Sequence, residues 1–373
     1  MRNCIHIMHL ITSLEPSGAE RVVYELATRT DRSRFAVSAA CIRAVRGEVG
    51  QWLERAGIRV HYLDVKSKFS PAKFFSLVNL LKRERVKILH THLFHGDQAG
   101  RIAARLTGVP AVVSTEHIVE RRRLPWRTVI NAMTWRMADK IICVSNSVRN
   151  HLRTTHRIPP GRLAVIPNGI DIEKLRVPIS KTDARRKFRL PEQARVVASA
   201  GRLDYQKGYD LLIHTVLILI KRFPELVFCI AGDGPDNENL AEQARGMGLQ
   251  NIIRFLGQVN NVPELLQAAD FYVQPSRWEG HPLALIEAMA VGLPVVATDV
   301  PGNRDAIISE ETGILVEVES PESLAAGLGY IISEEEKAAK LGAAAAAFAN
   351  REYDAKTMAA RYGKIYEELG KKA

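Results

Sequence analysis

Short apolar runs rich in valine and isoleucine alternate along the chain with longer amphipathic stretches. This alternation is typical of buried parallel strands joined by crossover helices, so the sequence predicts an α/β protein. The strands predicted in the N-terminal half are Ile5 to Ile11, Phe35 to Cys41, Val60 to Val65, Ile88 to His92, Ala111 to Thr115, Lys140 to Ser145 and Leu163 to Pro167. Those predicted in the C-terminal half are Val196 to Gly201, Val227 to Gly232, Ile252 to Leu256, Phe271 to Gln274, Pro294 to Thr298 and Ile314 to Val316.

The segment from Asp171 to Phe188 separates the two sets of strands and is polar, as expected of a linker. A chain of 373 residues is also long enough for two domains, and two lobes imply a cleft. We therefore predict an N-terminal domain over residues 1–175 and a C-terminal domain over residues 176–354. Residues 355–373 have helical periodicity without a following strand, and we expect them to pack back on the N-terminal domain.

The charge of the chain is unevenly distributed. Its composition, with 46% apolar and 25% charged residues, is that of a globular protein and excludes a mainly disordered or fibrous chain. The net charge is +11, but residues 1–175 carry 29 Lys and Arg against 14 Asp and Glu, a balance of +15, which leaves −4 for the remainder. The N-terminal half therefore suits a phosphate-rich partner: a nucleic acid, an anionic membrane or a phosphorylated substrate.

The sequence contains no signal for export or for membrane insertion that we can identify. Polar residues follow the first apolar run at once, so no signal-peptide core is present there. No stretch reaches the roughly 18 apolar residues of a spanning helix. We expect a cytoplasmic protein, with peripheral binding to the inner face of the cell membrane as a further hypothesis.

Glycines cluster where predicted strands end. In open parallel sheets ligands bind beyond these ends, and free amides at a helix start can hold a phosphate or a sugar. Gly18 follows the first strand in this way. Another strand ends in Gly232 and Gly234, which allow close backbone approach to a ligand. The full dinucleotide fingerprint does not follow the first strand of either half, which argues against an NAD-dependent dehydrogenase.

Two cations stand between a predicted strand and a predicted helix in the run from Gly201 to Gly208. Arg202 offers a planar fork and Lys207 a mobile point charge. Together they suit a diphosphate that gains negative charge as a bond breaks.

Two glutamates lie eight residues apart in the densest motif of the chain, which runs from Pro275 to Ala290. We expect Glu279 in a loop and Glu287 about five residues into a helix that starts near Pro282. If helical throughout, the interval would rise roughly 12 Å, whereas the paired carboxylates of glycoside hydrolases are about 5 to 9.5 Å apart. The pair is therefore better suited to holding an extended ligand with hydroxyl groups at both ends, such as a nucleotide sugar.

These motifs together resemble the retaining glycosyltransferases of family 4. The resemblance covers almost the whole chain and rests on the following segments: Gly18-Ala19-Glu20, Pro167-Asn168-Gly169-Ile170-Asp171, Gly201-Arg202-Leu203, Lys207-Gly208, Gly232-x-Gly234-Pro235, and the Glu279-Gly280-His281-Pro282-Leu283 start of the Glu-x7-Glu motif. It implies the GT-B fold, in which two Rossmann-like domains with parallel sheets face a central cleft. In that fold residues 1–175 would form the acceptor-side domain and residues 176–354 the donor-binding domain.

The resemblance also implies roles for individual residues. Arg202 and Lys207 would bind the donor diphosphate, Glu279 would contact the transferred sugar and Glu287 the ribose. His117 would lie near the sugar, and Gly18 would close over the donor. The remaining residues expected to bind the donor are Gly201, Gly232, Gly234, Gly280, His281, Pro282 and Leu283.

One segment departs from the family pattern. Asn303 and Asp305 stand where the family usually has a glycine and a glutamate, which leaves the local contact open. We interpret His92 and His95, which also lie near a strand end, as structural.

The resemblance further implies retention of configuration, with the acceptor hydroxyl attacking on the leaving-group face. No side-chain nucleophile is then required. Neither an Asp-x-Asp motif nor a histidine–carboxylate cluster is recognisable, so we expect no metal and no cofactor beyond the nucleotide-diphosphate sugar used as the donor.

For the acceptor, our leading hypothesis is a glycan or lipid-linked molecule of cell-surface polysaccharide, lipopolysaccharide or glycoconjugate synthesis, reached at an anionic membrane. Two basic and apolar segments motivate it, Lys66 to Lys87 and Arg121 to Trp135. The alternatives are a soluble small-molecule acceptor, a sugar-nucleotide epimerase of similar architecture and a nucleic-acid-binding module. The glutamate pair argues against the last, because carboxylates repel phosphate backbones, and we expect no nucleic acid.

Overall fold

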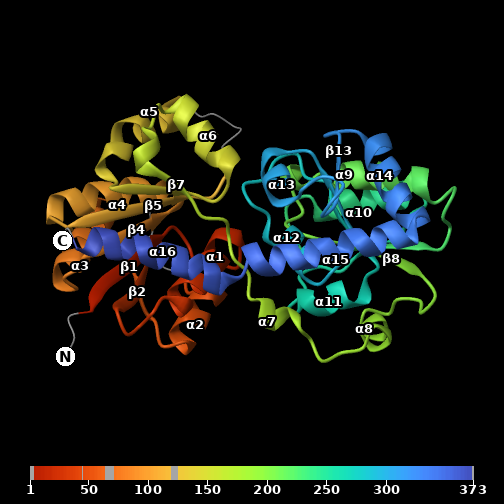
Figure 1. The fold of residues 1–373 in the computed structure, drawn as a ribbon, viewed down its shortest axis with the longest axis horizontal. Helices are drawn as coiled ribbons and strands as arrows, with labels where there is room; N and C mark the ends of the chain where they lie inside the picture. Colours follow the sequence, from red (N-terminus) through yellow and green to blue (C-terminus); the bar gives the residue numbers. More distant parts are fainter. Residues whose placement is uncertain (1–3, 44, 64–70, 119–124, 372–373) are drawn as a thin grey trace. The chain divides into compact units, whose positions relative to one another are not determined.

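The computed structural model describes residues 4–43, 45–63, 71–118 and 125–371. The chain divides into two compact units (Figure 1). The first contains the residues up to Ile170 together with the segment from Ala355 onward, and the second contains Asp171–Asp354.

The first unit is built on a sheet of seven parallel strands in the order β3-β2-β1-β4-β5-β6-β7. The strands are β1 (Ile5–Ile11), β2 (Phe35–Cys41), β3 (Arg59–Tyr62), β4 (Ile88–His92), β5 (Ala111–Glu116), β6 (Lys140–Cys143) and β7 (Leu163–Val165). The helices are α1 (Gly18–Arg29), α2 (Glu48–Arg55), α3 (Pro71–Arg83), α4 (Leu93–Thr107), α5 (Pro125–Thr134), α6 (Asn146–Thr155) and α16 (Ala355–Gly370), with short 3-10 turns at Trp135–Met137 and Pro160–Arg162.

The second unit is built on a sheet of six parallel strands in the order β10-β9-β8-β11-β12-β13. These are β8 (Arg195–Ala200), β9 (Leu226–Ala231), β10 (Ile253–Phe255), β11 (Phe271–Gln274), β12 (Val295–Thr298) and β13 (Ile314–Val316). The helices are α7 (Ile172–Leu175), α8 (Lys181–Lys187), α9 (Tyr209–Leu219), α10 (Asn237–Gly246), α11 (Val262–Ala268), α12 (Leu283–Ala290), α13 (Pro301–Ala306), α14 (Pro321–Ser333) and α15 (Glu335–Glu352), with a 3-10 turn at Tyr205–Lys207.

Within the described residues the predicted strands are confirmed, with ends that differ by at most three residues. The end predicted at Val65 lies outside the described residues. Runs such as Ile5–Ile11 form strands because their side chains enter a core on both faces of the sheet. Helices on the two faces cover them, and each unit has its own buried apolar core. The predicted α/β class with two parallel sheets is therefore correct.

Each sheet has one position where the strand order reverses. It lies between β1 and β4 in the first unit and between β8 and β11 in the second. At such a switch point the connections leave in opposite directions, so the loops beyond the carboxyl ends separate and leave room for a ligand. The fold thus directs attention to the loops that follow these four strands.

The segment expected to be a linker contains two short helices, α7 and α8, and belongs to the second unit. Each helix begins at a capping side chain: Asp171 accepts a hydrogen bond from the amide of Lys174, and Ser180 accepts one from Asp183. Caps of this kind start helices in polar sequence that has no apolar run to reveal them.

Helix α16 belongs to the first unit, where it lies beside α1 and β4 (blue in Figure 1). Its start is fixed because the amide of Ala355 donates to the carbonyl of Ile170 over 2.9 Å. Tyr362 and Tyr366 of this helix are buried. The phenol of Tyr362 lies 3.0 Å from Oγ1 of Thr115, so α16 supplies polar as well as apolar contacts to the sheet.

Much of the apolar surface that suggested membrane contact lies in the core instead. Leu77, Leu80 and Leu81 of α3 are buried in the first unit, as is Trp135. Phe75 of α3 is exposed, whereas Lys66 to Ser70 and Arg121 to Leu124 fall outside the described residues. Among the helices that the structure describes, none is long and apolar enough to cross a membrane.

Candidate active site

The loop after β8 carries Arg202 and Lys207 and returns to α9 through Gly208. Gly208 has a φ of 68°, and a Cβ atom there would lie 2.1 Å from the carbonyl oxygen of Pro275. A residue with a side chain would therefore be strained at this position and would clash with the loop after β11. Gly208 thus brings the Lys207 loop against the loop that contains Glu279.

The loop after β9 packs equally closely on the loop after β8. Gly232 has a φ of 138°, and a Cβ atom on it would lie 1.9 Å from the carbonyl oxygen of Gly201. A Cβ on Gly234 would lie 2.2 Å from the carbonyl oxygen of Leu203. These glycines are therefore required for contact between neighbouring loops, and their expected role in approaching a ligand remains a prediction.

Glu279 lies in the loop between β11 and α12, as predicted, and only 6% of its surface is exposed. Its Oε1 atom accepts three hydrogen bonds: from Nζ of Lys207 over 2.5 Å, from Nε2 of Gln274 over 2.9 Å and from Oγ of Ser276 over 2.7 Å. A buried carboxylate is tolerated only when it is paired and hydrogen-bonded, and this arrangement supplies both conditions. Oε2 takes no part in these three bonds.

The two cations of the loop after β8 have different environments. Lys207 is half-buried and fixed by its ion pair with Glu279. Arg202 has 71% of its side chain exposed, and its Nε lies 3.6 Å from Asp204. Such a weak surface contact leaves the guanidinium able to move toward an anion.

Arg277 holds the loops after β8 and β11 together. Its guanidinium donates to both carboxylate oxygens of Asp210 over 2.8 and 2.6 Å, and it lies 4.0 Å from the centre of the Tyr205 ring. Its amide also donates to the carbonyl of Gln206 over 2.7 Å. The loop that carries Lys207 is therefore attached at three points to the segment that carries Glu279.

The rest of the glutamate motif is buried. Gly280, His281, Pro282 and Leu283 precede or begin α12, and Glu287 is the fifth residue of that helix. The ring of His281 meets Tyr353 edge-on at 4.8 Å between centroids. Burial lowers the pKa of His281 to about 4, so this ring is neutral near pH 7.

Asn303, where the sequence departs from the family pattern, is fully buried beside the site. Its Nδ2 donates to the carbonyl of Thr298 over 2.9 Å, while its Oδ1 has no hydrogen-bond partner among the described residues. The preceding Gly302 packs against Glu279, because a Cβ on it would lie 2.6 Å from the Glu279 carbonyl carbon. Asn303 is thus a site-adjacent residue to which sequence reasoning assigned no role.

Gly18 in the first unit is the exposed first residue of α1. Two residues later, Glu20 is buried and accepts hydrogen bonds from the hydroxyl groups of Ser13 and Ser17. Burial raises the pKa of Glu20, although both hydroxyl groups oppose this effect. The start of α1 is therefore held by a buried carboxyl, to which the sequence analysis gave no role of its own within the Gly18-Ala19-Glu20 segment.

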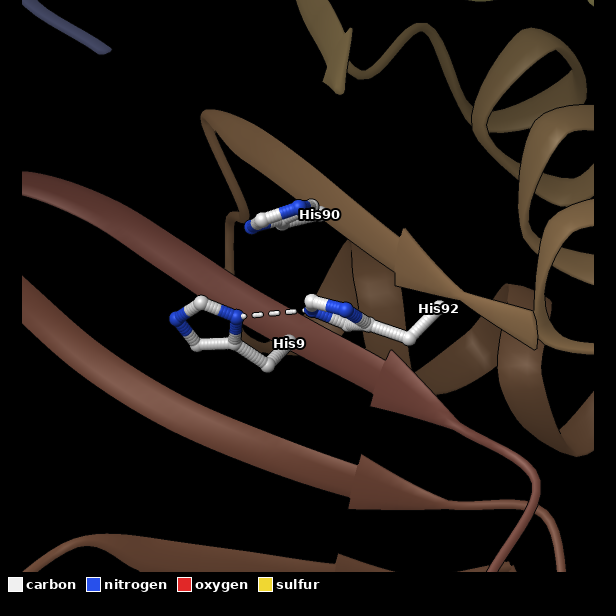
Figure 2. A group of neighbouring side chains, drawn as sticks. All are labelled: His9, His90 and His92. Atoms are coloured by element: carbon white, nitrogen blue, oxygen red, sulfur yellow. Dashed lines mark hydrogen bonds between the residues drawn. The ribbon is translucent and has the colours of Figure 1, made fainter. Parts of the chain in front are cut away.

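His117 follows β5 and is half-buried. Its Nε2 lies 3.2 Å from Nδ1 of His92, and Nε2 of His92 lies 3.2 Å from Nδ1 of His9. Figure 2 shows that His9, His90 and His92 come from the neighbouring strands β1 and β4, at the switch point of this sheet. The sequence analysis did not group these histidines, and the period-two spacing of His90 and His92 was the signal that they share one face.

Comparison with known proteins decides the family. The model of "Glycosyltransferase Family 4" matches residues 16–174, and that of "Glycosyl transferases group 1" matches residues 180–348. The UDP-Gal:alpha-D-GlcNAc-diphosphoundecaprenol alpha-1,3-galactosyltransferase of Escherichia coli is 30% identical over 343 residues, covering 86% of this chain and 86% of that enzyme. The chain is a member of glycosyltransferase family 4.

Other proteins and solved structures are also similar to this glycosyltransferase. LpsB, the lipopolysaccharide core biosynthesis mannosyltransferase of Rhizobium meliloti, is 29% identical over 257 residues, covering 67% of this chain and 70% of LpsB. The structure of HepE from Anabaena in complex with UDP-glucose has a TM-score of 0.87 at 22% identity and covers 98% of this chain and 100% of that one. This likeness shows the GT-B architecture of two Rossmann-like domains.

The second unit of the glycosyltransferase brings several of the expected site residues together. Lys207 and Glu279 form an ion pair, and Gly201, Gly232 and Gly234 shape the adjoining loops. The expected residues Gly18 and His117 lie in the first unit, after β1 and β5. Sequence reasoning assigned no role to Gln274, Ser276 and Asn303. The first two donate to Glu279, and Asn303 donates to the Thr298 carbonyl.

Proposed function

We propose that this glycosyltransferase is a retaining, metal-independent enzyme that moves a sugar from a nucleotide-diphosphate sugar to a glycan or lipid-linked acceptor. The observation that carries the proposal is the ion pair between half-buried Lys207 and buried Glu279 at the switch point of the second sheet. It places a cation for the diphosphate beside a carboxylate for sugar hydroxyl groups. Arg202, on the same loop, provides a second cation.

In the proposed reaction the bond between the anomeric carbon and the phosphate oxygen breaks, and the electron pair leaves with the diphosphate. The oxygen of the acceptor hydroxyl bonds to the same face of the anomeric carbon, and its proton passes to the departing phosphate oxygen. Lys207 and Arg202 stabilise the charge that grows on the leaving group. Glu279 accepts hydrogen bonds from the sugar through Oε2, which its three internal bonds leave out.

We infer a uridine diphosphate sugar as the donor. The E. coli relative is named for UDP-Gal, and the Anabaena structure contains UDP-glucose. We propose that Glu287 binds the ribose hydroxyl groups, since its carboxylate is buried within α12.

Replacing Glu287 with alanine is expected to raise the KM for the donor about 10- to 100-fold with little change in kcat. A hydrogen bond to a charged group contributes roughly 1.5 to 3 kcal/mol, and a ribose contact is equally strong before and during the reaction. Initial rates over a range of donor concentrations measure both constants. Glu287→Gln checks that the effect follows the charge, and Glu238→Ala, at an exposed position of α10, is the matched control. A loss of kcat alone would contradict the ribose assignment.

Thermal unfolding with UDP, GDP and ADP tests the donor directly. A nucleotide at about 100 times its Kd stabilises the protein by about 2.7 kcal/mol, and UDP is expected to give the largest shift. Incubation with a radiolabelled UDP-sugar then tests the reaction class: a transferase needs an acceptor for product formation, whereas an epimerase converts the sugar alone. Conversion of the sugar without an acceptor would reject the transferase proposal.

One observation supports a soluble acceptor as the second candidate. The D-inositol 3-phosphate glycosyltransferase of Thermobispora bispora is 29% identical over 306 residues, covering 76% of this chain and 71% of that enzyme. A phosphorylated acceptor would also suit the positive charge of residues 1–175. Parallel assays with a diphosphate-linked polyprenyl sugar and with inositol phosphate distinguish the two acceptors.

Two helices of the first unit support contact with a membrane. Helix α5 carries three exposed apolar residues at helical spacing, and the adjacent α4 carries two more. We call these five residues the α4–α5 patch: Ile102, Leu106, Trp126, Val129 and Met133. The helices are joined where Nε2 of Gln98 donates to Asn131 over 2.7 Å. The exposed Arg105 lies on α4, and Arg136 follows α5. Apolar side chains bordered by arginines suit an anionic interface.

The protein is expected to bind anionic vesicles through this patch and to be released by salt. Each Lys or Arg near an anionic leaflet contributes about 1 kcal/mol, and the attraction falls over about 8 Å at physiological ionic strength. Arg121, Arg122 and Arg123 precede α5 in the sequence and lie outside the described residues. Replacing these three arginines with glutamate should weaken binding at least 100-fold in cosedimentation. Met133→Glu should also weaken it, whereas Ile308→Glu, at an exposed site of the second unit, should not. Equal binding to neutral vesicles would favour the soluble acceptor.

A further inference from the structure

Three imidazole rings of the first unit form a continuous line of hydrogen bonds. Nδ1 of His9 lies 3.2 Å from Nε2 of His92 (dashed in Figure 2), and Nδ1 of His92 lies 3.2 Å from Nε2 of His117. These residues come from β1, from the end of β4 and from the loop after β5, which are adjacent in the sheet. We call His9, His92 and His117 the imidazole chain.

All three rings are neutral near pH 7. Burial lowers the pKa of His9 to about 3 and that of His117 to about 4, and it holds the pKa of His92 well below its ordinary value. A neutral imidazole carries one N–H donor and one bare nitrogen that accepts. Each ring of the chain can therefore donate at one nitrogen and accept at the other.

This restriction couples the three rings. If His9 donates from Nδ1, His92 accepts at Nε2 and must carry its own proton on Nδ1. His92 then donates to Nε2 of His117, whose proton must also be on Nδ1. In the opposite arrangement all three protons are on Nε2, and any mixed arrangement would place two protons or two lone pairs in one hydrogen bond.

The ring of His90 lies beside that of His92, with 4.1 Å between centroids and a tilt of 39°, but it belongs to a different network. Its Nδ1 lies 2.6 Å from the hydroxyl of Tyr366, and its Nε2 lies 2.7 Å from Oγ1 of Thr115. Both of its nitrogens are therefore engaged. The histidines around β1 and β4 are arranged for hydrogen bonding and not as three ligands that converge on one ion, although their nitrogens lie within 4.8 Å of one another.

The two ends of the imidazole chain differ in their surroundings. Nε2 of His9 is buried and has no hydrogen-bond partner among the described residues. The other end is Nδ1 of His117, on a half-buried residue. An orphaned N–H is rarer inside proteins than an acceptor that lacks a donor, which favours the arrangement with a bare Nε2 on His9.

We propose that His9 and His92 are positioning residues that hold His117 in the Nδ1–H tautomer, so that His117 presents a neutral hydrogen-bond donor to a hydroxyl oxygen of the bound sugar. The contact with the sugar rests on the function proposed above. In this tautomer the outward nitrogen of His117 is not a base, so it does not compete with the departing phosphate oxygen for the acceptor proton.

NMR of protein labelled with 15N at its histidine rings tests the coupling without any substrate. Long-range 15N–1H correlation spectra distinguish a protonated ring nitrogen from a bare one, and single substitutions assign the 11 histidines. The expected result is a proton on Nδ1 in His9, His92 and His117. Mixed tautomers, or a shared Nε2–H tautomer, would overturn the proposal. So would stoichiometric Zn²⁺ binding that is lost on replacing His9.

His9→Leu tests whether the buried end controls His117. The substitution removes Nε2 of His9, which has no partner, and leaves Nε2 of His92 without its partner. Within the imidazole chain the number of buried ring nitrogens without a partner therefore stays at one, and the fold should persist. The 15N shifts of His117 are expected to move toward a mixture of tautomers. His6→Leu is the matched control, because His6 lies on the same strand but bonds to Ser38 and to the Glu84 carbonyl. If the 15N shifts of His117 are unchanged in His9→Leu, His9 does not determine the tautomer of His117.

Kinetics separate this inference from the proposed function. His9→Leu is expected to lower kcat/KM for the UDP-sugar about five- to tenfold, the worth of one hydrogen bond, while UDP itself binds as before. A single shared tautomer with unchanged transfer would refute the contact between His117 and the sugar. Mixed tautomers in the wild-type protein would refute the coupling, whatever the activity.

Discussion

Replacing Lys207 with alanine is expected to lower kcat by about two to three orders of magnitude, with a smaller loss of UDP affinity. The charge that Lys207 meets grows as the bond to the diphosphate breaks, so its interaction is strongest in the transition state. The substitution also removes the cation that lies 2.5 Å from the buried carboxylate of Glu279. Arg202→Ala should act in the same direction but more weakly, because Arg202 is largely exposed. Steady-state rates and UDP titration measure the two effects.

The control for Lys207→Ala is Lys181→Ala. Lys181 is the first residue of α8 and forms an ion pair with Asp270 of the same unit. Removing the Lys181 side chain should leave kcat unchanged. Urea unfolding of both variants shows whether activity is lost through unfolding. If Lys207→Ala retains the wild-type kcat, or loses activity only in proportion to its folded fraction, Lys207 has a structural role and no part in catalysis.

Lowering the pH from 7 to 5 is expected to reduce the stability of the first unit by several kcal/mol. Burial holds the pKa values of His9, His90 and His92 far below 6.5, so these rings stay neutral in the folded protein and become protonated on unfolding. The unfolded chain therefore binds more protons below pH 6.5, and the free energy of unfolding falls as the pH falls through that value. At pH 5 His9, whose pKa is about 3, contributes a loss of about 2 kcal/mol, and His90 and His92 act in the same direction.

Two buried carboxyl groups act in the opposite direction. Burial raises the pKa values of Glu20 and Asp97, so the folded protein takes up protons at these groups and offsets part of the loss. The clearest measurement is therefore a difference: between pH 7 and pH 5, His9→Leu should lose about 2 kcal/mol less than the wild-type protein in urea unfolding. An equal loss in both proteins would show that His9 is not neutral in the folded state.

The strands could be predicted because they are buried on both faces. Runs such as Leu226–Ala231 and Phe271–Gln274 need apolar side chains at nearly every position, and this pattern is local in sequence. Helices α7 and α8 have no such pattern, since each is short and starts at a single capping side chain. The burial of Leu77 and Leu80 in the core could not be predicted either. An amphipathic helix has the same sequence pattern whether its apolar face packs on a protein core or on a membrane.

The residues of the candidate site could be predicted, but most of their contacts could not. Lys207 and Glu279 are separated by 72 positions, and their pairing depends on β8 and β11 being neighbours. The imidazole chain depends in the same way on the order β1-β4-β5. The residue types in the loops follow from the chemistry of a nucleotide sugar, whereas strand order is a property of the whole sheet and has no local signal.

The position of α16 in the first unit has a consequence for synthesis on the ribosome. Ile170 and Ala355 are bonded neighbours in the folded unit, but translation separates them by the whole of the second unit. At about 5 to 20 residues per second, the nascent first unit waits roughly 10 to 40 s for the helix that carries Tyr362 and Tyr366. During that interval Thr115 and His90 lack their tyrosine partners, so the segment made first is the one whose folding is completed last.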